Sequence, residues 1–123
     1  MEESPFKGRT GLARLGNALI YSLHGFASAF KHEDAFCMEL LLAAVLIPLA
    51  FMFDVPAMSR AIMIASVLLM LIVELLNSAL ESVVDRVSIE KHPLSKRAKD
   101  MGSAAVLLSL FNAAVVWGFA LIY

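Results

Sequence analysis

Residues 61–85 read AIMIASVLLMLIVELLNSALESVVD, and this stretch decides the fold. From Ala61 to Val73 every residue except Ser66 is apolar, and Glu74 then follows without any turn signal. A helix that continues through this junction, at about 100° per residue, gathers its polar residues on one face. That face carries Glu74, Asn77, Ser78, Glu81, Ser82 and Asp85. An ionisable residue inside a membrane-type helix is costly to hold there, so this polar stripe is a candidate functional site.

The composition is that of a membrane protein. The 123 residues are 60% hydrophobic and 17% charged, against roughly 45–50% and 25% in soluble domains. The apolar residues gather in three blocks, 35–53, 61–84 and 101–123, and crossing a hydrocarbon core takes about 20 helical residues. Strand-type alternation is missing, and only helices or closed barrels cross lipid. We therefore predict a small all-α integral membrane protein with a single membrane domain over residues 1–123.

The basic residues predict an orientation. Four precede the first apolar block, five lie between the second and third, and Arg60 alone lies on the other side. The nine that share one side are Lys7, Arg9, Arg14, Lys31, Arg86, Lys91, Lys96, Arg97 and Lys99. By the positive-inside rule the N-terminus and the loop 85–100 are cytoplasmic. The polar stripe then opens toward the cytoplasm, and a net charge of −1 gives no sign of nucleic-acid binding.

Residues 6–31 predict an amphipathic helix that lies in the membrane interface. Leucine and phenylalanine recur there at intervals of three and four residues, and polar side chains line another face. A signal peptide is the alternative, because Lys7 and Arg9 precede apolar residues and Ala27-Ser28-Ala29 imitates a cleavage site. Asn17 and Tyr21 interrupt the apolar part that such a peptide needs. The helix can serve as a plain surface anchor, as a lid over the site, or as both.

The polar stripe suits a cation and a phosphate that the cation carries. Magnesium takes oxygen ligands and uses one or two carboxylates together with substrate phosphates and water. Glu81 on the stripe and Glu33 at the mouth of the first span fit that demand, and the basic loop 85–100 can hold phosphates. The simpler interpretations are helix-end charges at the membrane surface and a solvated loop that sets topology. The sequence has no glycine-rich phosphate loop, its single Cys37 excludes an internal disulfide, and its histidines lack metal-ligand spacing.

Two motifs carry a family resemblance. ELLNSALESVVDR (74–86) and HPLSKRAKDMGSAAV (92–106), together with Glu33 and AFCME (35–39), resemble the prokaryotic diacylglycerol kinase family over nearly the whole chain. DMGSA (100–104) is closer to the Gram-negative diacylglycerol branch than to the Gram-positive undecaprenol kinase branch. Members of the family carry Trp and basic residues where this chain has Leu23, His24, Ala27 and Phe30, which leaves the lipid contacts of the surface helix open.

The resemblance implies a homotrimer of three-span protomers, each with an interfacial helix, in the bacterial inner membrane. It implies transfer of the γ-phosphate of magnesium ATP to diacylglycerol at the cytoplasmic face, which gives phosphatidic acid. Glu74 would be the general base, and Glu33 and Glu81 would hold Mg²⁺. The residues around ATP would be Arg14, Tyr21, Glu33, Asn77, Glu81, Glu90, Lys91, His92, Lys99 and Asp100. Those around the lipid would be Arg14, Ser28, Glu39, Glu74 and Ser103.

The residues themselves are consistent with this chemistry. Phosphoryl transfer needs positioning and charge neutralisation more than covalent work, so a few carboxylates, one cation and a basic loop can suffice. A small multidrug transporter also uses a membrane glutamate, but it needs four spans and no phosphate-binding loop. In a non-catalytic membrane subunit the stripe would instead join helices. Within the kinase class, undecaprenol kinase is the alternative activity.

Overall fold

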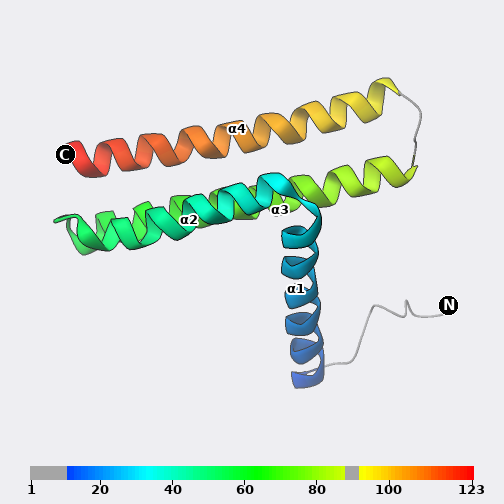
Figure 1. Ribbon diagram of the computed structural model, residues 1–123, viewed down its shortest axis with the longest axis horizontal. Coiled ribbons are helices and arrows are strands. Elements are labelled where there is room, and N and C mark those ends of the chain that lie inside the picture. The colour runs from blue at the N-terminus through cyan, green and yellow to red at the C-terminus, as the bar shows by residue number, and fades with distance from the viewer. Residues whose placement is uncertain (1–10, 88–91) are drawn as a thin grey trace.

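The computed structural model describes residues 11–87 and 92–123, and these residues form four helices. In chain order they are α1 (Leu12–His32), α2 (Asp34–Met52), α3 (Ala57–Val87) and α4 (Pro93–Ile122). The all-helical prediction is confirmed. In Figure 1 the axes of α2, α3 and α4 are roughly aligned and form a bundle, and α1 lies across this bundle at a steep angle. α3 packs against both α2 and α4, so it is the central helix.

The first two helices are delimited by single residues. Gly11 has a φ of 73°, a value that a side chain would strain and that cannot continue a right-handed helix. α1 therefore begins at Leu12, and the predicted start at residue 6 lies outside the described residues. Glu33 has extended backbone with φ −117° and ψ 103°, which separates α1 from α2 and turns the chain into the bundle. The conformation of this one residue sets the steep angle seen in Figure 1.

α3 is longer than the apolar block that predicts it. Its 31 residues span about 46 Å at 1.5 Å per residue, against about 30 Å for a hydrocarbon core. The helix passes the predicted limits 61–84 at both ends, and the extension at its C-terminal end includes Asp85, the last residue of the polar stripe. α2, α3 and α4 are each long and apolar enough to cross a membrane, with mean hydropathies of 2.3, 2.2 and 2.2.

α4 begins inside the segment that the sequence predicts to be a loop. Pro93 occupies the first turn, where its missing N–H costs nothing. The ring Nδ1 of His92 caps the helix by accepting a hydrogen bond from the Leu94 amide at 3.1 Å. Lys99 and Asp100 therefore lie on a rigid helix, and their separation from α3 is fixed by helix packing.

The core joins α2, α3 and α4. Ala43 of α2 packs with Val67 and Met70 of α3, and all three are buried. The indole Nε1 of Trp117 on α4 donates to the Met63 carbonyl of α3 at 3.1 Å, and this bond ties the two long helices together. Much of the remaining apolar surface on these helices is exposed in the single chain. Such a surface suits lipid or other copies of the chain.

The hairpin between α2 and α3 is tied by Arg60, the one basic residue that the sequence separates from the other nine. Its Nε donates to the Ala50 carbonyl at 3.0 Å, and its Nη2 donates to the Phe53 carbonyl at 2.9 Å. The last carbonyls of a helix lack partners within it. Arg60 satisfies them at the end of α2, which gives this residue a structural role and fixes the register of the hairpin.

Candidate active site

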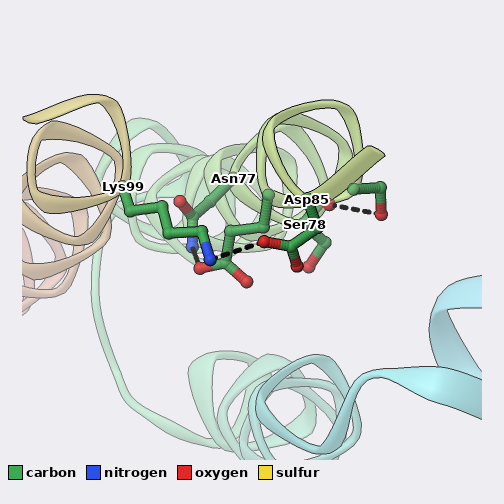
Figure 2. Close-up of polar contacts among 6 residues, drawn as sticks. Asn77, Ser78, Asp85 and Lys99 are labelled. Carbon is green, nitrogen blue, oxygen red and sulfur yellow. Dashed lines mark hydrogen bonds and ion pairs between the residues drawn. The ribbon is translucent and has the colours of Figure 1, made fainter. Parts of the chain in front are cut away.

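A polar cluster joins α3 and α4 at the end of the bundle where α4 begins. The Asn77 Nδ2 donates to Glu81 Oε1 at 3.2 Å, one helical turn further along α3. The ammonium of Lys99 on α4 lies 2.6 Å from Asp85 Oδ1 on α3. Figure 2 shows Lys99 crossing from its helix to Asp85 and passing beside Asn77. We call Asn77, Glu81, Asp85 and Lys99 the α3–α4 cluster.

Gly102 allows α4 to approach this cluster. A Cβ at that position would overlap Asn77 Oδ1 and would lie 3.3 Å from the Leu80 Cδ2. Asn77 Oδ1 is buried and meets no hydrogen-bond donor from the described residues. An amide oxygen that is left unsatisfied in this way costs free energy unless a ligand or a water supplies a partner. The close helix packing thus holds a free oxygen acceptor beside Glu81.

The Lys99–Asp85 pair positions a positive charge near Glu81. The two side chains are 44% and 64% exposed, and an exposed pair contributes little to stability. The hydrogen bond to Asp85 raises the pKa of Lys99, which lies before the apolar part of α4, above its ordinary 10.5. The lysine therefore contributes its full stabilisation at pH values below the pKa that it has in the unfolded chain. This stabilisation is lost as the pH rises through the higher pKa that Lys99 has in the folded protein. At neutral pH the ammonium is charged.

Two glutamates meet inside the bundle between α2 and α3. Glu39 is 9% exposed and Glu74 is 4% exposed. Neither carboxylate oxygen of Glu39 meets an N–H or O–H donor from the described residues; its ionisable neighbour is the Glu74 carboxyl. Glu74 therefore occupies the buried, apolar setting that the sequence predicts, and it has a second carboxyl for a neighbour.

A cavity of about 400 Å³ separates α1 from α3. Ser22, Gly25 and Ser28 line it from α1, and Glu33 borders it at the break before α2. The remaining polar lining comes from α3, where Ser78 and Ser82 face the cavity. Its volume falls within the range of small-molecule sites, and its walls combine apolar surface with a few hydroxyls and one carboxylate.

The predicted magnesium ligands lie in two different settings. Glu33 borders the cavity, whereas Glu81 belongs to the α3–α4 cluster. Within residues 11–87 and 92–123, three or more His, Cys, Asp or Glu side chains do not come together as a metal cage. The donors still suit a hard cation, because two carboxylates and the unpaired Asn77 oxygen are oxygen ligands and Mg²⁺ retains water and substrate phosphates.

The other predicted site residues are spread along the chain. Arg14 and Tyr21 are exposed on α1, whose first turn lies away from the bundle in Figure 1. Asp100 pairs with Lys96 at 2.7 Å on the surface of α4, and Ser103 is exposed one turn further on. His92 caps α4. Glu90 and Lys91 lie outside the described residues. A single protomer thus gathers the α3 and α4 residues and leaves those of α1 apart.

Sequence reasoning missed Gly102 and the partner of Asp85. Asp85 is on the predicted stripe, but its role as the partner of Lys99 depends on how α4 packs. Gly102 lies in an apolar run and carries no chemistry. One signal was available, since a glycine inside a helix is unfavourable and often marks a close approach.

Comparison with known proteins identifies the family. The profile of the family described as prokaryotic diacylglycerol kinase matches residues 20–121. The chain belongs to the prokaryotic diacylglycerol kinase family. A protein named diacylglycerol kinase from Pseudomonas aeruginosa is 59% identical over 122 residues, 99% of both chains. Proteins of the same name from Haemophilus influenzae and Escherichia coli K12 are 51% identical over 114 residues and 46% identical over 108 residues. These alignments cover 93% and 88% of this chain, and 97% and 88% of the relatives.

The family match extends over the features that form the candidate site. It begins within α1 and includes all of α2 and α3 and nearly all of α4. The cavity, the buried glutamate pair and the α3–α4 cluster all fall within it. The prokaryotic diacylglycerol kinase profile therefore covers nearly all of the described bundle.

Proposed function

We propose that this protein phosphorylates diacylglycerol with ATP to give phosphatidic acid, at the cytoplasmic face of the inner membrane. Family membership at 59% identity over 99% of both chains supports the substrate class. The observation that carries the mechanism is Glu74, a carboxylate buried within an apolar helix beside a polar cluster. A diacylglycerol stays in the bilayer, so its hydroxyl must meet a base that also lies at membrane depth.

In the proposed reaction, Glu74 accepts the proton of the lipid hydroxyl. The lipid oxygen forms a bond to the γ-phosphorus of ATP while the bond from that phosphorus to the β–γ bridging oxygen breaks. ADP leaves with the electron pair of the broken bond, and the transferred group becomes the phosphomonoester of phosphatidic acid. A positioned base contributes about 10²–10⁴-fold to such a step, and the rest comes from orientation and charge neutralisation.

The α3–α4 cluster is the proposed phosphate-binding region. Lys99 presents an ammonium that Asp85 aims across the helix interface. Asn77 and Glu81 lie beside it on α3. Glu33 and Glu81 would hold Mg²⁺, which neutralises phosphate charge when bound. Arg14, Tyr21 and His92 would complete the nucleotide site, and Ser28, Glu39 and Ser103 would border the lipid, as the family resemblance implies.

A homotrimer follows naturally from this proposal. The single chain exposes apolar surface along all three long helices, and Arg14 and Tyr21 lie apart from the α3–α4 cluster. Assembly of copies would cover apolar surface and could bring α1 of one copy to the cluster of another. The measurement is the mass of the detergent-solubilised protein, determined by light scattering with the detergent contribution subtracted.

The decisive experiment is Glu74→Gln, which keeps shape and hydrogen bonding but cannot accept a proton. We expect the turnover number to fall by about 10²–10⁴-fold, the usual contribution of a positioned base. Asp54→Asn is the matched control, because Asp54 is an exposed carboxylate in the turn between α2 and α3, several helical turns away from Glu74. Both variants should express and assemble normally. If Glu74→Gln turned over at the wild-type rate, Glu74 would not be the base.

Substrate and sidedness need a second assay. ATP is enclosed on one known side of oriented vesicles, and initial rates are compared for diacylglycerol and undecaprenol at equal surface concentration. We expect diacylglycerol to react faster, with ATP on the side of the 85–100 segment. A preference for undecaprenol would replace the substrate and keep the kinase. Activity only with ATP on the opposite side would overturn the proposed orientation.

A further inference from the structure

Glu39, which the family resemblance places beside the lipid, is a buried carboxyl to which the proposed mechanism gives no chemical step. It is 9% exposed, and both of its oxygens are shut off from solvent without a donor from the described residues. Burying an ionised carboxylate without a hydrogen-bond donor costs free energy. Such a group therefore becomes neutral by taking up a proton, or it interacts with a partner. A carboxyl held this way in a small bundle calls for a specific partner.

The register of the α2–α3 hairpin supplies that partner. The two helices are antiparallel, and Ala43 of α2 packs with Met70 of α3. One turn toward the start of α2 lies Glu39, and one turn toward the end of α3 lies Glu74. Residues four apart lie on the same face of a helix. Because the helices are antiparallel, moving four residues back along α2 and four residues forward along α3 again gives two residues that face each other. The packing of the core therefore places the two buried carboxyls on facing turns of α2 and α3.

Two carboxylates cannot stabilise each other while both are ionised. An ionised carboxylate only accepts hydrogen bonds, whereas a protonated one has an O–H to donate. Like charges at this distance also repel strongly in an interior, so one carboxyl of such a pair retains its proton. Because the Glu39 oxygens have no other donor among the described residues, the arrangement is satisfied when a single proton lies between Glu39 and Glu74.

We propose that Glu39 is the positioning residue of Glu74, and that it carries the shared proton and donates it as a hydrogen bond to the Glu74 carboxylate. This inference rests on the proposed role of Glu74 as general base. The bond holds one Glu74 oxygen toward α2 and leaves the other oxygen to take the hydroxyl proton of the lipid. It also keeps Glu74 ionised in an apolar interior, the state in which it can act as a base. Glu39 itself does not touch the reacting atoms.

The test compares Glu39→Gln with Glu39→Met. Glutamine keeps an N–H donor and closely copies a protonated glutamate, whereas methionine keeps the approximate volume and removes the donor. We expect Glu39→Gln to retain the wild-type turnover number within about threefold. Glu39→Met should lose about 10- to 100-fold in turnover number, the usual effect of losing a hydrogen bond to a charged group. The KM for ATP should stay unchanged in both variants, because Glu39 does not belong to the proposed nucleotide site.

The two variants separate positioning from a structural role. Glu39→Met leaves the buried Glu74 carboxyl without its partner, but Glu74 can take up a proton and become neutral, so Glu39→Met should still fold. Fluorescence of Trp117, the sole tryptophan, and circular dichroism check this directly. Turnover of Glu39→Met at the wild-type level would overturn the proposal. The proposal would also be overturned if the turnover number of Glu39→Gln were as low as that of Glu39→Met, because Glu39 would then act through its charge and not through a donated hydrogen bond.

A spectroscopic measurement tests the proton without relying on activity. The infrared difference spectrum between wild type and Glu39→Gln is recorded at neutral pH in a maltoside detergent, which has no carbonyl group. We expect a carboxylic acid carbonyl band in wild type that is lost in Glu39→Gln. The absence of that band would overturn the proposal that Glu39 carries a proton shared with Glu74. Failure of the proposed function is recognised separately, by a wild-type protein without diacylglycerol-dependent turnover or by an active Glu74→Gln.

Discussion

Replacing Gly102 with alanine should reduce activity more than it reduces stability. A Cβ at this position would overlap Asn77 Oδ1, and something must move to admit it. The Asn77 side chain is short and held by one hydrogen bond, to Glu81 at 3.2 Å. The helix backbones are held by the core around Ala43, Val67 and Met70. We therefore expect Asn77 to rotate away while α3 and α4 keep their spacing.

The expected changes in stability nearly cancel. Alanine is more favourable than glycine inside a helix by about 1 kcal/mol. Loss of the Asn77 hydrogen bond to a charged carboxylate costs about 1.5–3 kcal/mol when the pair is well buried, and less here because both side chains are only half-buried. The net change in the free energy of unfolding is then a destabilisation of about 1 kcal/mol or less. Activity is affected directly, because Asn77 and Glu81 belong to the proposed nucleotide site.

The assay measures the turnover number, the KM for ATP and the denaturation midpoint of Gly102→Ala in parallel with Gly118→Ala. Gly118 lies on the same helix, and a Cβ there meets nothing within 4 Å in the single chain. We expect Gly118→Ala to keep full activity and Gly102→Ala to raise the KM for ATP several-fold. If both variants behaved alike in activity, the contact between Gly102 and Asn77 would not shape the site.

Three further outcomes test other parts of the molecule. Glu33→Gln and Glu81→Gln should each raise the magnesium concentration that half-saturates activity at fixed ATP, and an unchanged value in both would exclude them as ligands. Lys99→Gln should raise the KM for ATP by about tenfold or more, the usual effect of losing a charged hydrogen bond; Asp85→Asn should do less, because the ammonium remains. Trp117→Phe removes the bond to the Met63 carbonyl and should lower the free energy of unfolding by about 1 kcal/mol, measured by denaturant titration, with an unchanged turnover number.

The helices were predictable because lipid leaves few choices. A chain with apolar blocks of membrane length must satisfy its backbone internally, and this demand selects helices. The ends of the helices depended on local chemistry that hydropathy does not measure. α4 starts at Pro93 instead of residue 101, because His92 and Pro93 form a helix start within a charged segment. α3 continues to Val87 because its polar stripe keeps helical spacing after the apolar run has ended.

The sequence could predict how the candidate site residues are arranged along one helix, but not which residues they face on the neighbouring helices. Helical periodicity alone places Glu74, Asn77 and Glu81 on one face of α3. The partners of that face depend on how neighbouring helices pack, which a single sequence does not specify. Asp85 meets Lys99 because Gly102 lets α4 come close.

The central helix explains how so short a chain can hold a site at a membrane surface. α3 is longer than a hydrocarbon core, so one continuous element carries Glu74 among apolar neighbours and Asp85 among exposed ones. A base for a lipid hydroxyl and a cluster for phosphates need these two settings at a fixed separation. Because the helix is rigid, that separation is set by residue count alone. α2 places Glu39 opposite Glu74, and α4 places Lys99 opposite Asp85, so each neighbouring helix completes one part of the same stripe.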